Sequence, residues 1–124
     1  MRLRTPTSLL PVVIAVALAG CGSAGEPVRE RGTTFTVTLD DYLIRPQALR
    51  VPGGKRLTIR VTNHGRQAHT LRIRGATKNI LAFTAVRPGE TRARQFSPGK
   101  GTYTMFCVLA NHEELGLHGK LTVG

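Results

Sequence analysis

Residues 101–123 read GTYTMFCVLANHEELGLHGKLTV, a pattern that predicts two β-strands joined by a loop. Successive side chains of a strand point to opposite faces, so Met105 and Cys107 share the inward face of the first strand. The alternating apolar residues near the end of the stretch mark the second strand in the same way. Cys107 therefore ends the buried row of one strand, and His112 follows in the loop. A thiol and an imidazole that bracket one short loop are typical of a metal site.

A third candidate ligand lies upstream, where His69, Leu71 and Ile73 alternate with polar residues. His69 is therefore expected at the start of a strand, on its inward, apolar side. Two imidazoles and one thiolate, held by strand ends in a half-buried pocket, match a trigonal copper site of the blue-copper type. Rigid strands keep such ligands in one compromise geometry, so little reorganisation accompanies the change between Cu(II) and Cu(I). The residues therefore favour electron transfer.

This set of residues resembles the cupredoxin family, which includes plastocyanin, azurin, auracyanin and rusticyanin. The resemblance runs from about Phe35 to Val123 and implies one copper ion on two His ligands and one Cys ligand. The matching positions are Asn63, Gly65, His69, Gly101, Tyr103, Cys107, His112, Gly116 and Gly119. Asn63 and Thr70 are expected to support the ligands from outside the metal's coordination shell, Thr70 by a hydrogen bond toward the Cys107 loop.

Leu117 departs from the family pattern, because it stands where many members have an axial Met. A Leu side chain has no lone pair and cannot ligate copper. Two outcomes stay open: a three-coordinate copper site with a raised potential, or a site that no longer binds copper. His118, at a variable position of the pattern, is expected to point outward. His64 is expected to be an exposed turn residue.

Other chemistries fit the same side chains. One Cys and two His with a water molecule also suit zinc, although copper binds N/S ligands more tightly among the divalent ions. Cys107 is also compatible with a small buried hydrophobic residue. As a nucleophile with His112 as its base, it would lack a third group that orients the base. The chain contains no His-x-His, which catalytic copper clusters of related oxidases add, so we expect no enzyme activity.

The start of the sequence predicts export. Residues 1–20 carry two arginines and an apolar run too short to span a membrane, as in a signal peptide. The run ends in LAGC, which resembles a bacterial lipobox in which Cys21 is lipidated; an ordinary secretory cleavage site is the alternative. Lipidation would anchor the protein outside the cytoplasm on the bacterial cell membrane. Cys107 would then be an unpaired thiol in an oxidising compartment, which metal ligation would explain.

The sequence as a whole predicts three parts: the signal peptide over 1–20, a polar tether over 21–32, and one domain over 33–124. Phe35 and its neighbours alternate with threonines as a half-buried strand, and further strands are expected at 43–51, 80–86 and 91–96. Asp40, Asp41 and Tyr42 are expected to form a turn, with the two acids in turn and capping roles. Short strands, frequent turns and no helical period predict an all-β, antiparallel Greek-key β-sandwich.

The net positive charge of the chain limits the classes of partner that it is expected to bind. The chain carries 18 Lys and Arg against 7 Asp and Glu, and without residues 1–20 the balance is 16 against 7, or +9. Aromatic residues make up only 5%, so the basic and aromatic signature of single-strand nucleic-acid binding is missing. We expect a monomer that binds an acidic redox partner near an exposed edge of His112. Attraction to anionic lipid is one alternative. A solvated basic surface with no specific partner is another. The alternative functions are an envelope copper-delivery protein and a binding module that has lost copper.

Overall fold

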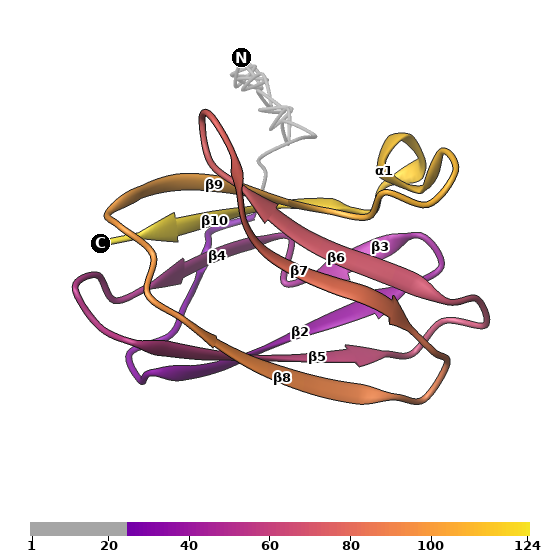
Figure 1. The fold of residues 1–124 in the computed structure, drawn as a ribbon, viewed down its shortest axis with the longest axis horizontal. Helices are drawn as coiled ribbons and strands as arrows, with labels where there is room; N and C mark the ends of the chain where they lie inside the picture. Colours follow the sequence, from indigo (N-terminus) through magenta and orange to yellow (C-terminus); the bar gives the residue numbers. More distant parts are fainter. Residues whose placement is uncertain (1–24) are drawn as a thin grey trace, which may run out of the picture.

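The computed structural model describes residues 25–124, which form two β-sheets packed face to face (Figure 1). The elements in chain order are β1 (Val28–Arg29), β2 (Thr34–Asp40), β3 (Leu43–Arg45), β4 (Ala48–Val51), β5 (Leu57–Asn63), β6 (His69–Arg74), β7 (Asn79–Val86), β8 (Thr91–Phe96), β9 (Gly101–Phe106), α1 (His112–Leu115) and β10 (His118–Val123). Within residues 25–124, no helix has the length and apolar character needed to cross a membrane.

The predicted β-sandwich is confirmed, and its two sheets are mixed rather than purely antiparallel. One sheet has the order β1-β4-β10-β9-β6-β7, and the other has the order β3-β2-β5-β8. The pairs β1–β4, β4–β10 and β2–β5 are parallel. The chain passes through the other sheet between β3 and β5, so β5 returns beside β2 in the same direction. The antiparallel prediction rested on turn spacing, which cannot reveal such crossovers.

The core lies between the two sheets and follows the predicted alternation. Phe35, Val37 and Leu39 of β2 are at most 2% exposed. The inward rows of the other strands are equally buried: Leu57, Ile59 and Val61 of β5, Leu71 and Ile73 of β6, Met105 of β9, and Leu121 and Val123 of β10. Burial of one apolar row per strand is what fixes the pairing register, because a shift by one residue would turn each row to water.

The segment 43–51 is divided as its proline suggests. Pro46 has no N–H to donate, and the chain leaves one sheet after β3 and enters the other as β4. β1 then flanks β4, and the Glu30 N–H donates to the Arg50 carbonyl at 2.9 Å. These residues fall inside the predicted tether, so part of it is hydrogen-bonded to the sandwich. The domain boundary at residue 33 stays a prediction, while the signal peptide and Cys21 lie outside the described residues.

The predicted loop between β9 and β10 contains one short helix. Four residues, 112–115, are too few to produce a helical period that a sequence pattern could reveal. The Leu115 N–H donates to the Asn111 carbonyl at 3.0 Å, and the helix ends at Gly116, whose φ is 131°. A side chain at Gly116 would lie 2.6 Å from the Tyr42 carbonyl oxygen, so the loop packs closely on the turn after β2.

Candidate metal centre

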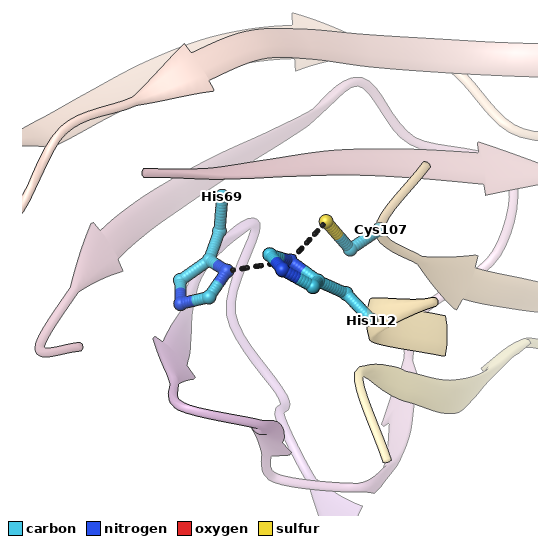
Figure 2. Close-up of side chains that lie close together, drawn as sticks. All are labelled: His69, Cys107 and His112. Carbon is cyan, nitrogen blue, oxygen red and sulfur yellow. Dashed lines mark hydrogen bonds between the residues drawn. The ribbon is translucent and has the colours of Figure 1, made fainter. Parts of the chain in front are cut away.

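The three predicted ligands meet at one end of the six-stranded sheet (Figure 2). β6 and β9 pair antiparallel, so the start of β6, with His69, lies on the same side as the end of β9, which Cys107 follows directly. α1 then brings His112 back toward both. The two His Nδ1 atoms lie 3.3 Å apart, and Cys107 Sγ lies 3.6 Å from His112 Nδ1. All three side chains are buried, with exposed fractions of 0% for His69, 1% for Cys107 and 7% for His112.

The donor atoms fit a metal ion. A transition-metal ion binds His nitrogen at about 2.0 Å and thiolate sulfur at about 2.3 Å, using zinc as the guide. In a planar trigonal site, those bonds separate two nitrogens by about 3.5 Å and nitrogen from sulfur by about 3.7 Å. The two observed separations are close to these values, and the ligand atoms all lie within 4.8 Å of one another. Two imidazoles and a thiolate are the donor set of copper and zinc sites.

Thr70 connects the two strands that carry ligands. Its backbone N–H and its hydroxyl both donate to Cys107 Sγ, at 3.4 and 3.5 Å. The Thr70 hydroxyl oxygen in turn accepts the Val108 N–H at 2.9 Å. Both donors therefore point at the sulfur atom that would bind a metal. Thr70 thus lies where the sequence reasoning placed it, between the His69 strand and the Cys107 loop.

Asn63 holds the loop that delivers His69. Its side chain is fully buried, and its Nδ2 donates to the carbonyls of Gln67 and Val86 at 2.7 and 2.8 Å. Its Oδ1 accepts the Gly65 N–H at 2.8 Å. One amide side chain therefore satisfies three backbone groups of neighbouring loops and fixes the approach to β6.

Leu117 is fully buried at the end of the loop after α1. Its backbone N–H donates to the His112 carbonyl at 2.9 Å, and its carbonyl accepts the Cys107 N–H at 3.1 Å. The residue thus ties two ligand residues together through its backbone. Its side chain offers no donor atom to a metal. His118 and His64 are both exposed, as expected.

Sequence reasoning missed Asp41, which reaches the centre from the turn after β2. Its Oδ1 lies 2.6 Å from His69 Nε2, and its Oδ2 accepts the Arg66 N–H at 2.6 Å. The Arg66 N–H foremost, and the His69 imidazole after it, hold the pKa of Asp41 below its ordinary value against the opposing effect of burial. The side chain is therefore a carboxylate at neutral pH. No local pattern reveals this contact, because 28 residues separate the two side chains.

Tyr42 covers the centre from the same turn. Its ring centroid lies 4.9 Å from that of His112 and 6.2 Å from that of His69. The Tyr42 hydroxyl accepts a hydrogen bond from Gln67 Nε2 at 2.8 Å, which links the turn to the His69 loop. The expectation of an exposed His112 edge is wrong: the side chain is 7% exposed because neighbouring residues, Tyr42 among them, pack over it.

An ion pair outside the centre fastens α1 to the sheet. Arg74 Nη2 lies 2.8 Å from Glu113 Oε1, and the Arg74 guanidinium lies 4.1 Å above the Phe106 ring. Both charged side chains are partly exposed, so the pair contributes little stability by itself. Its position limits the ways in which α1, and with it His112, can move away from β6.

A family model described as cupredoxin-like domain matches residues 10–123. The fold is similar to that of reduced auracyanin from Roseiflexus castenholzii, with a TM-score of 0.69 and 22% identity over 77% of this chain and 99% of that one. The fold is also similar to that of rusticyanin from Thiobacillus ferrooxidans, with a TM-score of 0.66 and 18% identity over 83% of this chain and 85% of that one. Auracyanin A from Chloroflexus aurantiacus has a TM-score of 0.62 and 22% identity, over 80% of this chain and 100% of that one. No curated protein sequence matches this chain.

Proposed function

Because this chain belongs to the family of cupredoxin-like domains, we propose that it binds one copper ion and carries single electrons. The observation that carries the proposal is the convergence of His69, Cys107 and His112, three buried ligand side chains whose donor atoms lie within 4.8 Å of one another. A structural neighbour, auracyanin A, is described as a blue copper protein, which agrees with this assignment.

The protein surroundings suit electron carriage. Bound copper would supply a one-electron change between Cu(II) and Cu(I). The chain's own residues hold the ligands still, since His69 and Cys107 lie at the ends of paired strands and Thr70 bridges them. The centre is dry, because all three ligands are buried. A rigid, dry site keeps reorganisation small, and the donors do not have to move when the charge of the ion changes.

In this proposal Leu117 would take the place of the axial ligand and would contribute no donor to the copper. Without a weak axial donor, Cu(II) loses more stabilisation than Cu(I), which raises the potential. Asn63 and Thr70 act as outer supports of the ligands, as their hydrogen bonds to the His69 loop and to Cys107 Sγ suggest.

The partner in this proposal is an acidic redox protein. The strand register sets Arg74 of β6 and Lys120 of β10 on either side of Thr104, so two basic residues follow one row across the outer face of the six-stranded sheet. Arg74 also pairs with Glu113, the residue after His112, so the row contacts α1 at one end. Association through such a row weakens with salt. We further propose a monomer that binds no nucleic acid and has no enzyme activity of its own.

The proposed location is outside the cytoplasm, with a lipid anchor at Cys21. The support for it is the sequence of residues 1–21, which resembles a lipoprotein leader. Mass spectrometry of the protein from bacterial membranes tests the anchor. An acylated Cys21 at the mature N-terminus is the expected result, and a soluble protein with an unmodified start contradicts it.

The test of copper binding is a titration with Cu(II), followed by absorption and then by reduction. We expect an intense thiolate-to-copper band in the visible region that saturates at one ion per chain. The band should vanish on reduction and return on oxidation. Cys107→Ser should lack the band, and His118→Ala, which changes an exposed His, should keep it. A protein that stays colourless contradicts the proposal, whether it retains zinc or no metal.

A further inference from the structure

The turn between β2 and β3 brings the carboxylate of Asp41 to the Nε2 atom of His69, the ring nitrogen that does not face the other ligands. Asp41 Oδ1 lies 2.6 Å from His69 Nε2, whereas the other ring nitrogen of His69, Nδ1, faces His112. The second oxygen is held by the Arg66 N–H at 2.6 Å, so both oxygens of the carboxylate have a partner and its orientation is fixed. The His69 side chain is 0% exposed and that of Asp41 is 21% exposed, so water screens this contact only in part.

This contact determines which nitrogen of His69 carries the proton. An ionised carboxylate only accepts hydrogen bonds, so the hydrogen of neutral His69 must be on Nε2. Nδ1 then keeps its lone pair, and Nδ1 is the atom that faces His112 and Cys107. A carboxylate behind a ligand imidazole also makes that imidazole a stronger electron donor.

The neighbouring loop is shaped around the contact. A Cβ atom at Gly65 would collide with Asp41 Oδ1 and would lie 2.8 Å from His69 Nε2. The Gly65 N–H is held in place by Asn63 Oδ1. Any larger residue at position 65 would force the carboxylate and the imidazole apart, so the approach of Asp41 to His69 depends on a glycine at this place.

We propose that Asp41 is a positioning residue that fixes His69 for copper and lowers the reduction potential of the centre. This inference rests on the proposed function. The carboxylate charge stabilises Cu(II) more than Cu(I), because the attraction grows with the charge of the ion. Leu117 acts in the opposite direction, since it withholds an axial donor. The potential of the centre is therefore set by two features with opposite effects, the carboxylate of Asp41 and the missing donor at Leu117.

The experiment is a measurement of reduction potential in Asp41→Asn and in a matched control, Asp40→Asn. The Asp41→Asn substitution keeps the size of the side chain and one acceptor oxygen, which can face His69, but it removes the charge and the oxygen that accepts the Arg66 N–H. The control removes the same charge from the adjacent residue, whose Oδ2 lies 3.7 Å from Arg45 Nη2 and whose Oδ1 accepts the Asp41 N–H at 3.1 Å, a bond that an amide oxygen can keep. We expect a higher potential in Asp41→Asn only. Loss of an outer partner of a ligand costs at least about tenfold in metal affinity. If that loss falls on Cu(II) alone and the Cu(I) affinity is unchanged, the potential rises by about 59 mV. Equal potentials in the two variants overturn the charge effect.

A second measurement needs no copper. In the copper-free protein at alkaline pH, NMR of the imidazole nitrogens should find the His69 proton on Nε2, and in Asp41→Ala it should be divided between the two nitrogens. A wild-type His69 with its proton on Nδ1 overturns the positioning role, even if Asp41→Asn fails to bind copper. A wild-type protein that forms no blue site contradicts the proposed function, and the inference about the potential falls with it, while the NMR result still decides the positioning role.

Discussion

Replacement of Asn63 by Ala should destabilise the domain strongly, because one side chain holds three backbone groups. The variant loses the hydrogen bonds to the Gln67 and Val86 carbonyls and from the Gly65 N–H. Each bond contributes roughly 0.5–1.5 kcal/mol, and buried groups left without a partner cost more. The expected loss in the free energy of unfolding is therefore about 2–4 kcal/mol.

Urea unfolding of the copper-free protein measures this loss without any contribution from metal binding. Asn79→Ala is the matched control, because Asn79 begins β7 on the surface and is exposed. We expect less than about 0.5 kcal/mol for the control. If Asn63→Ala also changed stability by no more than the control, the three hydrogen bonds would not hold the His69 loop, and our account of how His69 is positioned would be refuted.

Three more changes probe the centre and its supports. Thr70→Val removes the hydroxyl that donates to Cys107 Sγ. The reduction potential should fall, because that hydrogen bond favours the more electron-rich sulfur of the reduced state. An unchanged potential would contradict a role for the hydroxyl. Leu117→Met offers a weak axial donor and should also lower the potential, and voltammetry that finds no shift would mean that residue 117 does not face copper. Gly65→Ala should lower the midpoint of thermal unfolding by several degrees, since the new Cβ would collide with Asp41. Gly32→Ala, where a Cβ would have no atom within 4 Å, should leave the midpoint unchanged. Equal midpoints in the two variants would contradict the close packing of Gly65 against Asp41.

The alternation of apolar residues predicted the sandwich well. Each inward row, such as Leu57, Ile59 and Val61, is buried because a strand in a two-layer fold has one dry face. The same logic placed His69 and Cys107 inward at strand ends. Their meeting then required that β6 and β9 be antiparallel neighbours, which the sheet order shows.

The features that the sequence could not reveal depend on contacts between distant segments. Asp41 and Tyr42 read as an ordinary turn, and only the packing of that turn against the His69 loop brings them to the centre. The burial of His112 has the same origin, because Tyr42 lies over its ring. The parallel strand pairs arise from crossovers between sheets, which leave no local signal. α1 is a single turn and too short for periodicity.

X-ray absorption at the copper edge is the most direct test of the copper ligands, since it reports the number and kind of atoms bound to the ion. We predict two nitrogen donors of imidazole type and one short sulfur donor per copper, from His69, His112 and Cys107. The sulfur contribution should disappear in Cys107→Ser. A spectrum of the wild-type protein with nitrogen and oxygen donors only would contradict the assignment of these three residues as the copper ligands.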